Sequence, residues 1–172
     1  MILAIDPGNE KSAWVLYNEG NIHACGIDDN MQMRTKLCLI GGNGCYCVDH
    51  MTIEMIASYG MAVGKTVFDT CLWIGRFIEL WAVDHGHTTY TQVYRKDVKM
   101  HLCHSMRAKD ANIRQAIIDR YPATGGGKLP QIGTKNNPGP LYGVSKDIWA
   151  AIGVAITYEE TIMATSMKTK GT

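Results

Sequence analysis

The chain has 172 residues, of which 46% are hydrophobic, and its formal net charge is +1. A chain of this size can bury one core without disulfides or a structural metal, so we expect a single domain over residues 1–172. The small net charge does not by itself indicate a nucleic-acid binder. No uncharged apolar run of about 18 residues occurs, which argues against a membrane-spanning helix and a membrane partner.

Short apolar runs separated by turn residues dominate the N-terminal half. The run from Ile2 to Asp6 ends at Pro7-Gly8, and Glu19-Gly20 separates the next two runs, as expected for a strand meander. Further on, apolar residues at intervals of three or four indicate a long amphipathic helix. In chain order we predict strands at 2–6, 12–17 and 21–27, a helix at 29–39, a strand at 46–55 that ends near Glu54, and a helix at 63–84.

The C-terminal half begins with a segment rich in Thr, Tyr and Val, which favours a strand at 88–94. Helices are predicted at 96–103 and 109–121. Residues 123–143 include three consecutive glycines and three prolines, and we expect a long loop that is functional or mobile. Ser145 is placed to cap a final helix that runs to about Met163. This order of elements predicts an α/β fold in which helices flank a mixed sheet.

Six cysteines occur without a C-x-x-C pair, and no apolar leader of the secretory kind precedes the first strand. We therefore expect reduced thiols and a cytoplasmic protein. Cys45 and Cys47, with His50 nearby, could be metal ligands. A second ligand pair at zinc spacing is missing, however, so a zinc site is disfavoured.

Three acids share a type of position. Asp6 and Glu54 close predicted strands, and Asp147 opens the predicted final helix after a glycine-containing loop. Two strand ends and a helix N-terminus can converge at one edge of a sheet, where carboxylates can hold two Mg²⁺ ions about 4 Å apart for phosphodiester hydrolysis. Acids are also common at strand ends, and the helix macrodipole alone favours an acid at position 147.

Four segments resemble, in order, the RuvC family of Holliday-junction resolvases. They are ILAIDPG from Ile2, TIE ending at Glu54, RKDVK from Arg95 and DIWAAIGVAITY from Asp147. The resemblance implies a ribonuclease H-like fold, a mixed five-stranded sheet flanked by helices. It also implies that Asp6, Glu54 and Asp147 are catalytic, metal-binding residues that hold Mg²⁺ or Mn²⁺, two ions per site. The tract at 133–143 is similar to phage and prophage members, which implies a phage-encoded protein acting in a bacterial cell.

One position departs from the family pattern. The family usually places a second acid three residues into the last helix, where this chain has Ala150. This departure leaves three alternatives. Asp147 completes the site without a second acid, or another acid such as Asp69 contributes to it, or the protein is a relative with weakened or no activity. A solvated helix face is the simpler role for Asp69.

Basic and aromatic residues of the family suggest contacts with DNA. Lys99 matches a lysine that supports catalysis or holds the scissile phosphate, whereas Lys109 falls one position short of a second such lysine, whose slot holds Asp110. The family's base-stacking aromatic aligns with Ala57, and Tyr59 is the nearest ring. The residues predicted to contact DNA are Tyr59, Arg95, Lys96, Lys99, Arg107 and Lys109. The alternative roles are solvated helix faces and, for Tyr59, an ordinary loop residue.

The favoured function is a metal-dependent endonuclease that nicks two symmetric strands of a four-way DNA junction as a homodimer, since two active sites suit a two-fold substrate. The helix at 63–84 is a candidate dimer face, although packing on the sheet explains it equally well. The alternatives are a less selective nuclease for flaps and other branched DNA, and a non-catalytic junction-binding relative. Actin-like and sugar-kinase ATPases share the opening strand but need a duplicated second half.

Overall fold

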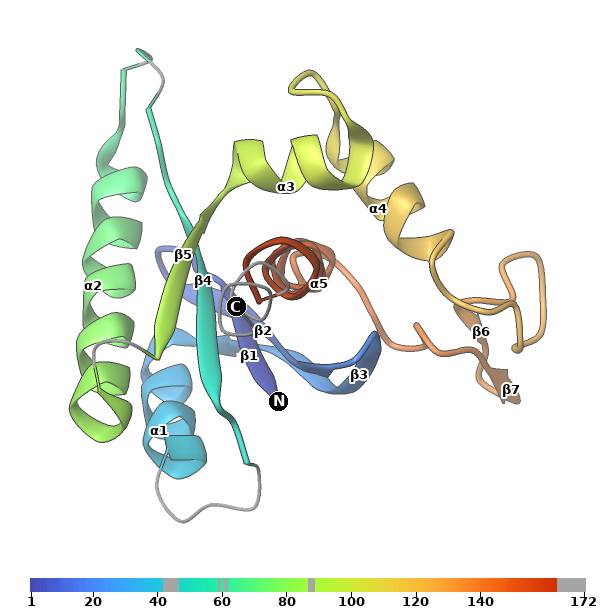
Figure 1. The fold of residues 1–172 in the computed structure, drawn as a ribbon, viewed down its shortest axis with the longest axis horizontal. Coiled ribbons are helices and arrows are strands. Elements are labelled where there is room, and N and C mark those ends of the chain that lie inside the picture. Colours follow the sequence, from blue (N-terminus) through green and yellow to red (C-terminus); the bar gives the residue numbers. More distant parts are fainter. Residues whose placement is uncertain (42–46, 59, 61, 87–88, 164–172) are drawn as a thin grey trace, which may run out of the picture.

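The computed structural model describes residues 1–41, 47–58, 60, 62–86 and 89–163, and in this part of the chain five strands form one mixed sheet (Figure 1). The strands are β1 (Ile2–Asp6), β2 (Lys11–Asn18), β3 (Asn21–Asp29), β4 (His50–Met55) and β5 (Tyr90–Tyr94). Their order is β3–β2–β1–β4–β5. β1 pairs antiparallel with β2 and parallel with β4, and β4 pairs parallel with β5. The predicted mixed five-stranded sheet is confirmed.

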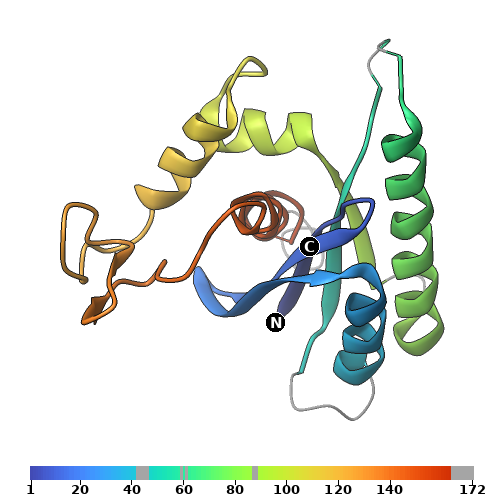
Figure 2. The same ribbon diagram turned by 180° about the vertical axis from the view of Figure 1, so that it is seen from behind.

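Helices cover both faces of this sheet. They are α1 (Asn30–Gly41), α2 (Lys65–His85), α3 (Arg95–Cys103), α4 (Asp110–Ile118) and α5 (Ile148–Thr157), and a π-helical segment, η1 (Tyr158–Met163), continues α5. Figures 1 and 2 show α1 and α2 on one side of the sheet and α5 on the other, with α3 and α4 beyond α5. No helix within the described ranges is both long and apolar enough to cross a bilayer.

Alternating side chains of the strands enter two apolar cores, one on each face. On β1, Ile2 and Ala4 pack in the core beneath α5, whereas Leu3 and Ile5 pack in the core beneath α1 and α2. On β4, Met51 and Ile53 belong to the second core. Because successive side chains of a strand point to opposite faces, the next residue of each strand, Asp6 or Glu54, points toward the α5 face.

Several predicted boundaries differ from the structure, among them the end of the helix predicted at 109–121, which the structure places at Ile118. Two other differences concern the starts of β4 and α5. The strand predicted at 46–55 begins at His50. Ser145 does not cap the final helix with its side chain, because Lys146 adopts a left-handed conformation (φ 47°) and the helix begins only after Asp147, at Ile148. The backbone carbonyl of Ser145 instead accepts a hydrogen bond from Ile148 N at 3.1 Å.

The segment predicted as a long loop at 123–143 is closely packed. It contains a short antiparallel pair, β6 (Gly133–Thr134) with β7 (Asn137–Pro138), and Leu141 is fully buried in the core beneath α5. A Cβ atom at Gly139 would lie 2.2 Å from the carbonyl oxygen of Pro130, so only glycine fits there. Its glycines therefore allow close backbone contact, and the segment is a folded lobe at the edge of the molecule (Figure 1).

Candidate active site

Asp6 and Glu54 are neighbours at the carboxyl ends of two adjacent parallel strands. The ladder between β1 and β4 aligns Ile5 with Ile53, so the next residue of each strand lies beside the other. Both side chains lie on the face of the sheet that α5 covers. Adjacent strands are about 4.8 Å apart, and the two carboxylates therefore meet at one edge of the sheet.

The start of α5 brings a third acid to the same place. Asp147 immediately precedes the first residue of α5, Ile148, and it lines a pocket of about 260 Å³ together with Asp6 and Glu54. The remaining residues that line this pocket are Arg95, Asp110, Ile113, Lys146, Trp149 and Ala150. The structure thus brings together the three acids that the sequence predicts as metal ligands. Asp69, on α2, does not line the pocket.

A buried polar contact holds the turn that follows Asp6. The side-chain amide of Asn30 donates to the carbonyl oxygen of Gly8 at 2.9 Å, and the hydroxyl of Ser12 donates to Oδ1 of Asn30 at 2.7 Å. Ser12 and Asn30 are almost fully buried. A Cβ atom on Gly8 would lie 2.3 Å from the carbonyl oxygen of Lys11, so glycine is required. These contacts fix the path of the chain just beyond Asp6.

The acids are difficult to ionise together. Burial and, next, the charge of Glu54 raise the pKa of Asp6 to about 8, with Arg95 acting against the shift and smaller contributions from Asp147 and Asp110. Burial also raises the pKa of Glu54, although Arg95 acts against that shift. Two neighbouring carboxyl groups whose pKa values are both raised form a site that a cation would stabilise.

Arg95, predicted as a DNA contact, is an internal partner of these acids. One guanidinium nitrogen lies 3.4 Å from Glu54 Oε2, and the other lies 2.5 Å from Asp110 Oδ1. Its side chain is 27% exposed, compared with 14% for Glu54. The guanidinium is therefore held within the pocket instead of extending toward solvent.

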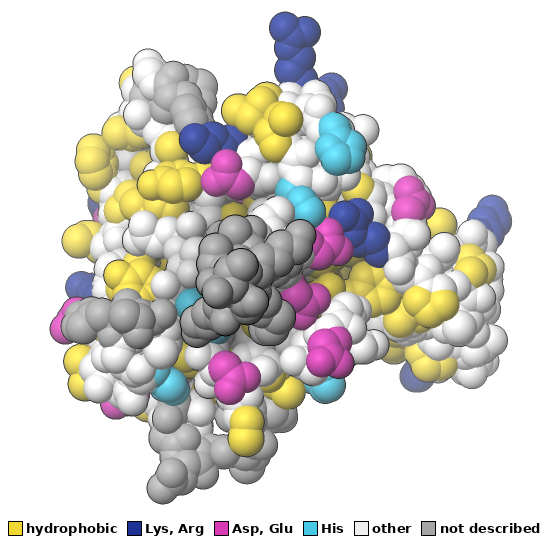
Figure 3. Space-filling model, viewed as in Figure 1, with side chains coloured by type: hydrophobic (Ala, Val, Ile, Leu, Met, Phe, Trp, Pro, Cys, Tyr) yellow, Lys and Arg dark blue, Asp and Glu magenta, His cyan; other side chains and the backbone are white. Residues whose placement is uncertain are grey.

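The other predicted DNA contacts surround the pocket at different distances. Lys99 is half-buried on α3, and its charge lowers the pKa of Glu54, so it lies near the acids. Lys96 lies over the ring of Tyr94, 5.7 Å from its centroid. Arg107 is exposed between α3 and α4, and Lys109 is exposed at the start of α4. Figure 3 shows Lys and Arg side chains projecting at the top of the molecule, above these helices. Tyr59 lies outside the described residues.

Lys146 and Asp110 line the pocket but were not among the predicted site residues. Lys146 is one of the few non-glycine residues with positive φ among the described residues, and nothing in the sequence indicates that conformation. The sequence does contain a signal for Asp110, because this residue occupies the position of the family's second lysine. Trp149, also in the lining, packs under the guanidinium of Arg114 at 5.1 Å.

The donor chemistry fits a hard divalent cation. The acids of the pocket offer carboxylate oxygens, which suit Mg²⁺ or Mn²⁺ better than zinc. In the part of the chain that the structure describes, no three His, Cys, Asp or Glu side chains are already gathered closely enough to hold an ion. The guanidinium of Arg95 lies between Glu54 and Asp110 and contacts both carboxylates. The described cysteines are free thiols.

The arrangement defines a class of fold, a mixed sheet with acids at the ends of its two central parallel strands and at the start of a covering helix. Two solved structures have a similar fold. *Thermus thermophilus* RuvC in complex with a Holliday junction substrate has a TM-score of 0.63, 11% sequence identity, and 92% of each chain covered. A second *Thermus thermophilus* RuvC structure has a TM-score of 0.59 with the same identity and coverage. The chain therefore has the RuvC-like, ribonuclease H-like fold.

No family model matches the sequence, and no curated protein matches it significantly. The likeness thus lies in the fold.

Proposed function

We propose that this protein is a divalent-metal-dependent endodeoxyribonuclease that resolves four-way DNA junctions by paired nicks. One observation carries the proposal: in a RuvC-like fold, Asp6, Glu54 and Asp147 come from three different elements to one small pocket. The solved neighbour is itself bound to a Holliday junction substrate. Acids at strand ends are common, but their convergence in this fold favours phosphodiester chemistry.

The residues of the pocket have distinct roles in this proposal. Asp6, Glu54 and Asp147 would hold two Mg²⁺ or Mn²⁺ ions. Bound there, the ions would supply an activated water and stabilise charge on the leaving oxygen. Lys99 and Lys146 hold the scissile phosphate beside the acids, and the lysine charges compensate the phosphate's negative charge. The buried contacts of Asn30 keep Asp6 oriented.

Contacts with the DNA arms lie on α3 and at the start of α4. Lys96, Arg107 and Lys109 are exposed and would bind backbone phosphates, which position a duplex without reading its sequence. Tyr59 is proposed to stack on bases at the junction centre, where one stacked ring contributes about 1–3 kcal/mol. Replacing Tyr59 by Ala should then weaken binding to junctions more than binding to linear duplexes.

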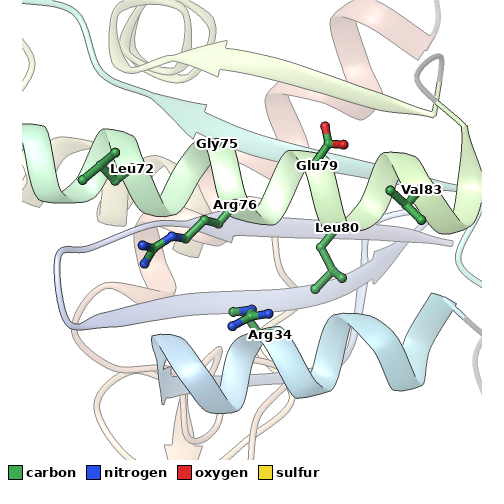
Figure 4. A pocket seen from close by; sticks show the side chains of 7 residues that line it. All are labelled: Arg34, Leu72, Gly75, Arg76, Glu79, Leu80 and Val83. Carbon is green, nitrogen blue, oxygen red and sulfur yellow. The ribbon is translucent and has the colours of Figure 1, made fainter.

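The homodimer is proposed to form through α2. Phe68, Leu72 and Val83 are 59%, 61% and 71% exposed on this helix, and a hollow of about 700 Å³ lies between α2 and α1 on the same side (Figure 4). Gly75 is at the midpoint of α2, and a Cβ there would meet nothing. Two antiparallel copies crossing beside Gly75 would set Phe68 near the partner's Val83, so the face complements itself.

A nicking assay on synthetic four-way junctions with Mg²⁺ or Mn²⁺ tests the proposal. We expect paired nicks from the wild type and none from Asp6→Asn, while Glu10→Gln, an exposed acid outside the pocket, cleaves normally. Equal cleavage of flaps or forks would favour a less selective nuclease. Tight junction binding without cleavage would favour a non-catalytic relative, which the alanine at position 150 makes a specific alternative.

The dimer has a separate test. Phe68→Glu should convert the protein from dimer to monomer in analytical ultracentrifugation and should leave single nicks in place of paired ones. A wild-type protein that sediments as a monomer at the concentrations used for cleavage would contradict this interface.

A further inference from the structure

A fourth acid lines the pocket, and it comes from α4, which contributes none of the predicted metal ligands. Asp110 is the first residue of α4, and both Asp110 and Ala150 line the pocket of Asp6, Glu54 and Asp147. The methyl group of Ala150 cannot ligate an ion. The pocket therefore lacks an acid on α5 and has one on α4.

The backbone of Asp110 is anchored against the pocket. Ile113, one turn further along α4, is 1% exposed in the core beneath α5 and lines the same pocket. The carboxylate of Asp110 is 85% exposed. A fixed backbone with a solvated side chain lets this carboxylate turn into the pocket without first breaking a buried contact.

Arg95 shows that a cation can contact carboxylates from both sides of this pocket. Its two terminal nitrogens contact Glu54 and Asp110 separately, which puts those two oxygens at most about 8 Å apart. Two Mg²⁺ ions about 4 Å apart, each with a bond of about 2 Å to an outer oxygen, span the same length. The greatest separation that the Arg95 contacts allow for these two oxygens is therefore about the length that two ions would span.

Building on the proposed function, we infer that Asp110 is a metal ligand of this site and replaces the acid absent at position 150. Arg95 then leaves Glu54 when ions bind, because the guanidinium and the ions would compete for the same carboxylates. The fourth carboxylate comes from α4, and the pocket keeps four acids despite Ala150.

Calorimetric titration of the full chain with Mn²⁺, in the absence of DNA, measures this directly. We expect Asp110→Asn to weaken Mn²⁺ binding by about tenfold or more, since even outer-shell partners of a metal cost 10–100-fold when removed. Asp97→Asn is the matched control, because Asp97 is also exposed in the first turn of a neighbouring helix but does not line this pocket. Its Mn²⁺ affinity should equal that of the wild type.

Two further variants separate a ligand from a residue that acts through Arg95. In an Arg95→Gln background, the loss caused by Asp110→Asn should persist if Asp110 binds the ion, whereas its disappearance would show that Asp110 only positions Arg95. Adding Ala150→Asp to Asp110→Asn should restore binding, because an acid returns to the lining at another place. Failure of that rescue, like an unchanged affinity in Asp110→Asn, would overturn the inference.

Asp6→Asn distinguishes this inference from the proposed function. If Asp6→Asn removes Mn²⁺ binding and Asp110→Asn does not, only the role of Asp110 fails. If Asp6→Asn also binds normally, the proposed metal site itself fails.

Discussion

Replacing Asp6 by Asn should stabilise the metal-free protein as it abolishes function. The carboxyl of Asp6 ionises near pH 4 in an unfolded chain, but burial and the charge of Glu54 raise its pKa to about 8 in the folded protein. The folded state therefore binds the extra proton between those pH values, and stability falls as pH rises through that window. Asn keeps the shape of the side chain and has no charge to bury.

The size of the effect follows from the width of that window. At about 1.4 kcal/mol for each pH unit, the full range gives an upper bound near 6 kcal/mol. Water reaches the pocket mouth and relieves part of this cost, so we expect Asp6→Asn to gain about 1–3 kcal/mol at pH 8.5 and almost nothing at pH 4. In a domain of this length, 1 kcal/mol corresponds to about 2–4 °C in melting temperature.

Urea unfolding with EDTA at pH 4, 6, 7 and 8.5 measures the difference, with Glu10→Gln as the exposed-acid control. Added Mg²⁺ should stabilise the wild type at pH 8.5 and leave Asp6→Asn almost unchanged, because binding to the folded state adds stability by mass action. Two results would refute this reasoning. One is an Asp6→Asn variant that is less stable than the wild type at pH 8.5, and the other is a difference in unfolding free energy between the two proteins that does not vary with pH.

Three further predictions concern residues that shape the site. Lys146→Gly should stabilise the protein by about 1 kcal/mol, because glycine tolerates the positive φ, yet reduce junction cleavage; unchanged cleavage would show that the lysine has no role. Asn30→Ala should cost about 2–3 kcal/mol in urea unfolding, since the Gly8 carbonyl and the Ser12 hydroxyl lose a buried partner; a cost below 0.5 kcal/mol would contradict this. Gly139→Ala should cost at least about 2 kcal/mol from backbone overlap, whereas Gly64→Ala, with open space around it, should change melting by little; similar effects of the two would argue against a tightly packed lobe.

The positions of Asp6 and Glu54 could be predicted because strand periodicity determines them. Side chains of β1 alternate between the two cores, and Met51 and Ile53 of β4 face the core beneath α1 and α2. The face that each acid occupies is therefore determined within its own strand. The local sequence pattern does not indicate that β1 pairs with β4, because 43 residues separate the two strands. The resemblance to a known family supplied that pairing, and the sheet order confirms it.

The start of α5 could not be read from local signals. Ser145 is a good capping residue, and a helix from that point is the ordinary expectation. Lys146 takes a left-handed conformation that is unfavourable for a residue with a Cβ atom. Because of this conformation the helix begins only after Asp147, whose side chain lines the pocket. Packing of Ile148 and Val144 in the core beneath α5 outweighs the local preference.

The role of Arg95 shows why a count of basic residues overstates the surface available to DNA. The stretch from 95 to 135 is basic in sequence, but Arg95 is paired with Glu54 and Asp110, Arg120 with Glu160, and the Arg114 guanidinium lies over Trp149. A cation that already has a partner inside the protein releases fewer counterions when DNA binds. The salt dependence of junction binding should therefore reflect the exposed Lys96, Arg107 and Lys109 more than the total charge. If bound ions displace Arg95 from Glu54, as inferred above, its guanidinium becomes available to a phosphate, and the salt dependence should then steepen when Mg²⁺ fills the site.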